Sequence, residues 1–331
     1  MDLSLTPTQA DIRAAARRYL DDRCPPSRPA EHAAELWPEL VRTGWLDPDL
    51  GAVELVLLAE ESGRALLPAP WWATTRAVPV YRAAGAELPG PVTSVDGTGS
   101  CVVRDGRLHG RCNAVVDART CAEIVVAADT GDGVALFGVR PDAPGVTLTD
   151  RPGPDLLRTA ADLVLTDVVG RLLLGPPAAA PVLAEVTRRS ALLAAAEGVG
   201  VATRALEFAA EHARTRVQFG RPIGAFQAVG HALAECYADV EAARSLVYRA
   251  ACAPDLPDAA HCATWSAARA AARCGETAIQ VCGGMGVTWE FPLHRWYRRA
   301  LWLEARVAAG PDPVDAIAAA LLGPETVEGT P

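Results

Sequence analysis

The chain contains no lysine: all 31 basic residues among its 331 residues are arginines. A protein without lysine cannot use an ε-amino group as a nucleophile or form a Schiff base with a carbonyl substrate. Acidic residues number 40, and the resulting net charge of −9 argues against nonspecific nucleic-acid binding, which needs a basic surface. The composition therefore excludes two broad classes of function before any motif is considered.

Signatures of metals, nicotinamide cofactors and membranes are also missing. The six histidines show no H-x-x-x-H spacing and the nine cysteines no C-x-x-C pair, so we predict no metal site. No G-x-G-x-x-G motif follows an apparent strand, which argues against a Rossmann dinucleotide site. Apolar runs stop short of the roughly 20 residues that a membrane helix needs, and no basic-then-apolar leader opens the chain. Because unpaired cysteines are typical of reduced thiols, we expect a soluble cytoplasmic protein without a membrane or nucleic-acid partner.

The order of elements predicts an α+β protein in three parts. Thr6-Pro7-Thr8-Gln9 has the form of a capping box, and helical patterns follow it. Short Val/Leu-rich segments separated by Gly-Asp turns then predict a middle antiparallel β domain. Long Ala/Leu-rich stretches after them predict a C-terminal four-helix bundle. The expected domains are an N-terminal helical domain at 1–88, the β domain at 89–175 and the bundle at 176–331.

Within these parts, individual elements are predicted from periodicity and from glycine and proline positions. Proline pairs end the first helix at Pro25-Pro26 and the third at Pro68 and Pro70. The predicted helices run from residue 7, across 36–45, and over 53–67 and 257–282. The predicted strands are 100–104, 107–113, 124–130, 134–140, 145–149 and 161–166.

One connection between two predicted helices carries the residues of a ligand site. From Arg216 to Gln227 the chain reads Arg-Val-Gln-Phe-Gly-Arg-Pro-Ile-Gly-Ala-Phe-Gln, and its glycines and proline cannot continue a helix. This places Arg216 at the end of one helix, Phe219 in the bend and Gln227 in the first turn of the next. A guanidinium, an aromatic ring, an amide and free helix-start N–H groups suit an anionic, flat, polar ligand. The alternative is that these residues only secure a turn between helices.

A second motif, Gln280-Val281-Cys282-Gly283-Gly284-Met285-Gly286, lies farther along the chain. Gly283 and Gly284 lack Cβ atoms, so a cofactor could approach the backbone closely there, and Gln280 could hydrogen-bond to it. A helix end followed by a flexible turn is the alternative interpretation.

In this order and separation, the two motifs resemble the flavin-contacting signatures of acyl-CoA dehydrogenases, and the resemblance spans nearly the whole chain. It implies that Arg216, Phe219, Gln227, Gln280, Gly283 and Gly284 bind FAD, most of which lies in a neighbouring subunit. The implied reaction removes the α proton and the β hydride from an acyl thioester carried by coenzyme A or a carrier protein. The electrons would then pass to an electron-transferring flavoprotein.

The base that this reaction needs is absent from both positions where the resemblance places it. The catalytic glutamate of the family falls on Val307 or on Ser190, and neither side chain can serve as the base. Glu197 shares a helix face with Ser190 two turns along, in an apolar setting that would raise a carboxyl pKa, and is the candidate base. A buried structural carboxylate is the alternative. In the β domain, the segments that correspond to the flavin-lining ones, 92–96 and 114–117, have lost most of their hydroxyl and aromatic groups.

These losses are one-sided, because the residues that a subunit offers to its neighbour's FAD are kept. We therefore predict a subunit that completes the FAD site of a longer acyl-CoA dehydrogenase chain, which supplies the base. Such chains resemble the small subunits of bacterial heterotetrameric acyl-CoA dehydrogenases of sterol side-chain degradation. An active homo-oligomer that uses Glu197, a flavin monooxygenase and a non-catalytic protein on the same fold are the alternatives.

Overall fold

Two compact units, each built from non-contiguous segments, make up the chain in this computed structural model. The helical unit comprises 1–29, 51–67 and 191–331, and the sheet unit comprises 30–50 and 68–190. The described residues are 4–25, 33–95, 101–256, 258–310 and 312–323. The predicted helix stop at Pro26, the strand start at Ser100, the helix start at Pro257, and Asp96 of the segment 92–96 lie outside the described residues.

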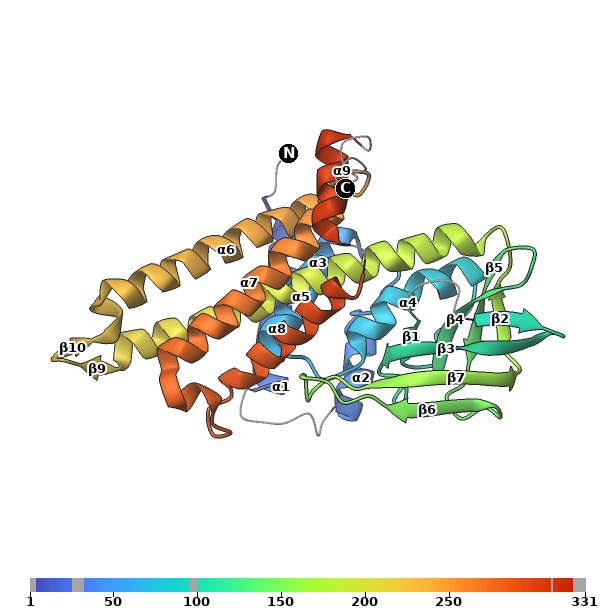
Figure 1. Cartoon of the computed structure of the whole chain (residues 1–331), viewed down its shortest axis with the longest axis horizontal. Helices are drawn as coiled ribbons and strands as arrows, with labels where there is room; N and C mark the ends of the chain where they lie inside the picture. Colours follow the sequence, from blue (N-terminus) through green and yellow to red (C-terminus); the bar gives the residue numbers. More distant parts are fainter. Residues whose placement is uncertain (1–3, 26–32, 96–100, 257, 311, 324–331) are drawn as a thin grey trace, which may run out of the picture. The chain divides into compact units, whose positions relative to one another are not determined.

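Helices form nearly all of the helical unit (Figure 1). The predicted capping box opens the first of them, because Thr6 Oγ1 accepts a 3.3 Å hydrogen bond from Gln9 N while Gln9 Oε1 accepts one of 3.0 Å from Thr6 N. No helix in the described part of the chain is long and apolar enough to cross a membrane. The helices with residues in this unit are α1 (Pro7–Arg23), α3 (Ala52–Ala65), α5 (Ala179–Thr215), α6 (Gln227–Cys252), α7 (Ala259–Cys282), α8 (Leu293–Ala308) and α9 (Pro313–Leu322).

Helices α3 and α5 touch backbone to backbone in the helical unit. A Cβ atom on Gly63 would lie 2.2 Å from the carbonyl oxygen of Glu197, and one on Gly200 would lie 1.9 Å from the carbonyl oxygen of Glu60. Real Cβ atoms do not come this close to a carbonyl oxygen, so only glycine fits at either position. This crossing fixes the position of Glu197, the candidate base, along the axis of α3.

The sheet unit is built on a mixed sheet, in which the described residues contribute eight strands in the order β6-β7-β3-β2-β4-β5-β8, with β1 paired to β4. Most neighbours are antiparallel, as predicted, but β1 and β2 both run parallel to β4. The strands are β1 (Val92–Ser94), β2 (Cys101–Arg104), β3 (Arg107–Val116), β4 (Glu123–Asp129), β5 (Val134–Val139), β6 (Val146–Asp150), β7 (Ala160–Val168) and β8 (Arg171–Leu174).

Helices α2 (Ala33–Arg42) and α4 (Trp71–Ala84) and the start of α5 complete the sheet unit. Helix α4 packs on the sheet through Ala77, Val80 and Tyr81, which join the core formed by β1, β4, β5, β8 and α5. Thr74 attaches β1 directly, because its hydroxyl oxygen accepts a 3.0 Å hydrogen bond from Val92 N and donates one of the same length to Val92 O.

The predicted α+β class and the order helices, strands, helices are confirmed. Helix α4 is not predicted from the sequence, because Pro70 precedes it and Pro79 lies inside it, and both suggest a break. Its side chains from Trp71 to Val78 are all buried, so packing outweighs the local preference. Strands β1 and β8 are three and four residues long, too short to show a period. The domain boundaries 1–88, 89–175 and 176–331 stay a prediction.

Candidate functional site

The connection between α5 and α6 is a small β-hairpin followed by one turn of 3-10 helix (Figure 1). Two-residue strands, β9 (Val217–Gln218) and β10 (Arg221–Pro222), pair antiparallel and leave Phe219 and Gly220 at the turn. Both turn residues have positive φ, 52° and 77°, as a type I′ turn requires. The sequence predicts the bend correctly but not the hairpin, because its strands have no room for an apolar alternation.

Arg216 stands at the base of this hairpin with its backbone held on both sides. Its N–H donates a 2.8 Å hydrogen bond to His212 O, and its carbonyl oxygen accepts one of 2.8 Å from Ile223 N. The side chain is exposed, so a fixed backbone presents a guanidinium to the surroundings. The pKa of His212, one turn earlier, is lowered, first by burial and then by the positive charge of Arg216.

Phe219 has an unusual conformation for an aromatic residue. Its side chain is 92% exposed, although its backbone adopts the left-handed conformation that side chains with a Cβ avoid. Its ring lies edge-on to that of Phe226, with the two centroids 6.1 Å apart. The hairpin turn accounts for the backbone conformation of Phe219, whereas its exposed ring packs little against the rest of the chain, so a contact between this ring and a cofactor stays a prediction.

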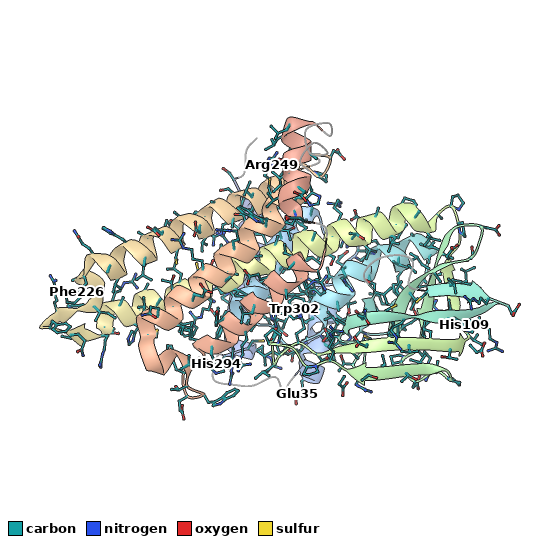
Figure 2. The ribbon with its side chains drawn as sticks, in the orientation of Figure 1. Glu35, His109, Phe226, Arg249, His294 and Trp302 are labelled. Carbon is teal, nitrogen blue, oxygen red and sulfur yellow. The ribbon has the colours of Figure 1, made fainter. Side chains whose placement is uncertain are left out.

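Gln227 is the first residue of α6, as predicted, and its exposed side chain lies next to an uncapped helix start. The N-cap residue is Phe226, which makes no side-chain capping bond. The first N–H groups of a helix carry a partial positive charge, and the exposed guanidinium of Arg221 lies over the Phe226 ring, 4.1 Å from its centroid. Figure 2 labels Phe226 at this end of the helical unit. The helix start and the Arg221 guanidinium together form a positively charged surface that suits an anion.

A groove of about 700 Å³ runs beside the hairpin and brings two predicted residues together. Phe219 and Gln280, which are far apart in sequence, both line it, whereas Arg216, Gln227, Gly283 and Gly284 do not. The lining comes from the hairpin, the following turn, the start of α6 and the end of α7. Its residues are Gln218, Phe219, Ile223, Phe226, Ala228, Val229, Ala232, Glu276, Thr277, Gln280 and Val281.

Gly283 and Gly284 end α7 on the same side of the helical unit. Gly283 has φ 61° and ψ −145°, and its N–H donates to the carbonyl oxygens of Gln280 and Ile279. A Cβ atom on either glycine would meet no atom of the described residues within 4 Å. Internal packing therefore does not demand glycine here, and close approach by a cofactor stays a prediction.

Glu197, the candidate base, forms an ion pair inside the helical unit. Arg299 Nη1 of α8 donates a hydrogen bond to Glu197 Oε1, and the two side chains are 0% and 2% exposed for Arg299 and Glu197. The sequence neighbours of Glu197 are apolar, and Arg299 lies 102 positions farther along the chain, so the ion pair cannot be predicted from the sequence around Glu197. Its catalytic role stays a prediction, but a buried carboxylate that is already paired favours the structural alternative.

The sheet unit holds the segment expected to line the flavin ring. Thr93 and Ser94 are buried in β1, and their hydroxyl oxygens have no hydrogen-bond partner among the described residues. The buried side chain of Arg76 in α4 donates to the carbonyl oxygen of Ser94 and, at 3.3 Å, to Ser190 Oγ. A guanidinium thus bridges two positions that the resemblance equates with a flavin contact and with the alternative base.

Two charged residues beside the hairpin and groove, Glu276 and Arg221, are missed by sequence reasoning. Glu276 lies one helical turn before Gln280 on α7, so the i, i+4 spacing could have identified it. Arg221 stands opposite Gln218 in the hairpin, a pairing that no helical pattern would suggest. Among the described residues, no group of three or more His, Cys, Asp or Glu side chains could hold a metal ion.

Known proteins share both the sequence and the fold. The family model for the acyl-CoA dehydrogenase C-terminal domain matches residues 181–319. The acyl-CoA dehydrogenase IpdE2 of Mycobacterium tuberculosis is 34% identical over 249 residues, which are 75% of this chain and 71% of IpdE2. The chain belongs to the acyl-CoA dehydrogenase family. IpdE2 of Mycolicibacterium smegmatis is 30% identical, over 75% of this chain and 72% of that protein.

Solved structures of acyl-CoA dehydrogenases align with the chain almost end to end. The ChsE4-ChsE5 complex from Mycobacterium tuberculosis matches with a TM-score of 0.83 and 27% identity, over 100% of both chains. A variant of the Tcur3481-Tcur3483 steroid ACAD matches with a TM-score of 0.82 and 27% identity, over 96% of this chain and 99% of that one. The family resemblance predicted from the two motifs is therefore confirmed. The fold is that of the acyl-CoA dehydrogenases, which are flavoprotein oxidoreductases that act on acyl-CoA.

Proposed function

We propose that this chain is a subunit of an FAD-dependent acyl-CoA dehydrogenase that completes the FAD site of a partner chain. The observation that carries the proposal is the exposed ring of Phe219 beside a groove that also contains Gln280. The residues fit an adenine dinucleotide: a groove with apolar walls for the adenosine, with two arginines and an uncapped helix start nearby for the pyrophosphate. Two of the most similar structures are named as two-component assemblies, ChsE4-ChsE5 and Tcur3481-Tcur3483.

In this arrangement the chain binds and orients, while the partner supplies the base. Bound FAD would accept the hydride that leaves the β carbon of an acyl thioester. Arg216 and the start of α6 would hold the pyrophosphate, and Phe219 and Gln280 the adenosine. The α proton would go to a carboxylate of the partner, because Ser190 and Val307 occupy the two positions expected for the base here. Electrons would leave to an electron-transferring flavoprotein.

The partner proposal is tested by purifying the chain alone and together with the product of the adjacent gene. We expect a colourless chain alone and a yellow complex that oxidises acyl-CoA. Full FAD occupancy and acyl-CoA oxidation by the chain alone would instead identify an active homo-oligomer. A colourless complex that never binds FAD would refute the proposal altogether.

Replacing Arg216 by alanine is expected to weaken FAD binding to the complex by roughly 10- to 100-fold, since a charged hydrogen bond contributes about 1.5–3 kcal/mol. Equilibrium dialysis followed by flavin absorbance measures the loss. Arg214→Ala is the matched control, because Arg214 is an exposed arginine near the end of α5 whose charge pairs with Glu211 at 3.7 Å. Equal losses in both variants would mean that only net charge matters and that Arg216 does not contact FAD.

Replacing Phe219 by glycine is expected to weaken FAD binding without lowering the stability of the chain. Glycine adopts positive φ without strain, so the free energy of unfolding should stay the same or rise by up to about 1 kcal/mol, which thermal unfolding measures. FAD retention by the complex should fall, because the ring is lost. A variant that binds FAD as well as the parent would remove Phe219 from the site.

A further inference from the structure

The groove beside the hairpin has opposite charges on its two sides. On the hairpin side, the Arg221 guanidinium lies over the ring of Phe226, which lines the groove, and Arg216 and the uncapped start of α6 add positive charge nearby. The opposite wall is the end of α7, where Glu276 lines the groove one turn before Gln280.

The Glu276 carboxylate is positioned to accept hydrogen bonds from a ligand. Its side chain is exposed to the groove, and Tyr297 donates only a long hydrogen bond of 3.4 Å to Oε1. The pKa of Tyr297 is raised, first by burial and then by the charge of Glu276, which places the two side chains close together. A carboxylate accepts bonds from hydroxyl and amino groups but repels phosphate.

Both ligands of the proposed reaction end in an adenosine diphosphate. FAD carries its ribose hydroxyls free, whereas coenzyme A carries a phosphate on the 3′ oxygen. A groove that recognised only adenine and pyrophosphate would bind either molecule, so discrimination needs a repulsive element.

We propose that Glu276 makes this groove select the unphosphorylated ribose of an ADP group and reject a 3′-phosphorylated one. Ribose hydroxyls donate to Glu276 on the α7 wall while the pyrophosphate lies toward the hairpin. A 3′-phosphate would stand against the Glu276 carboxylate, whose negative charge repels it. Glu276 thus acts as a specificity-determining residue that keeps coenzyme A out of the FAD site. The inference rests on the proposed function.

The test compares two probes, ADP and 3′-phospho-ADP, by titration calorimetry on the full chain. We expect the parent chain to prefer ADP roughly tenfold, and less at high salt, since the repulsion is electrostatic. In Glu276→Gln the preference should fall to about one, because the amide keeps the shape but not the charge. Glu211→Gln removes the same charge from an exposed position on α5, outside the groove, and should retain the parent's preference.

Each outcome separates the two proposals. If ADP binds but Glu276→Gln keeps the parent's preference, the selectivity inference is wrong while the FAD site stands. If neither nucleotide binds at millimolar concentration, the groove does not recognise adenosine by itself and the inference is overturned. The proposed function is decided independently, by whether the complex with the partner chain contains FAD.

Discussion

Replacing Arg299 by methionine is expected to lower the free energy of unfolding by about 3–5 kcal/mol. The substitution removes one member of an ion pair in which Arg299 and Glu197 are 0% and 2% exposed, and so takes the charge of Arg299 away from a buried carboxylate. Chemical denaturation followed by circular dichroism measures the loss. Arg140→Met breaks an exposed pair with Asp142 and should leave the unfolding midpoint unchanged.

The same pair decides whether Glu197 is a base or a structural residue. Glu197→Gln should destabilise the chain, and the double variant with Arg299→Met should recover part of the loss, because no buried charge then remains. Acyl-CoA oxidation by the complex should persist in Glu197→Gln once the protein is folded. Loss of turnover with FAD bound and stability intact would establish Glu197 as the base and contradict the partner proposal.

Replacing Gly200 by alanine is expected to destabilise the chain by about 3 kcal/mol or more, because the new Cβ would lie 1.9 Å from the carbonyl oxygen of Glu60. Neither backbone can move without separating α3 from α5. Gly63→Ala should have a similar effect, since its Cβ would lie 2.2 Å from the carbonyl oxygen of Glu197. Thermal unfolding of the purified variants measures both.

Gly198→Ala is the matched control for this prediction. Gly198 lies in the same helix, so alanine brings the same gain in helix propensity, but its Cβ would meet Ala267 O at 3.3 Å. We expect a small change in stability there. Equal losses in Gly198→Ala and Gly200→Ala would show that the close α3–α5 contact is not what requires glycine.

The sequence predicts those parts of the fold that depend on neighbours in the chain. The capping box at Thr6, the glycines and proline of the bend after Arg216, and the helix stop at Gly283 are all local signals. Helix α4 escapes prediction because Pro70 and Pro79 give a local signal that the burial of the helix from Trp71 to Val78 outweighs.

In the candidate site, too, the sequence predicts some residues, while others are found only from the fold. Motif spacing identifies Phe219 and Gln280, and the groove brings them together. Glu197 is found in the sequence as a carboxylate among apolar residues, but Arg299 becomes its neighbour only through the packing of α8. Glu276 lies outside both motifs, and only its spacing of one helical turn from Gln280 connects it to the groove.

The glycine crossing of α3 and α5 has a consequence for recognising distant relatives. Contacts with a cofactor can disappear once another subunit takes over the chemistry, but two helices that touch backbone to backbone tolerate no side chain between them. A relative stripped of every flavin contact would therefore still be expected to carry glycines equivalent to Gly63 and Gly200. That pair would mark common architecture in chains whose activity has been lost.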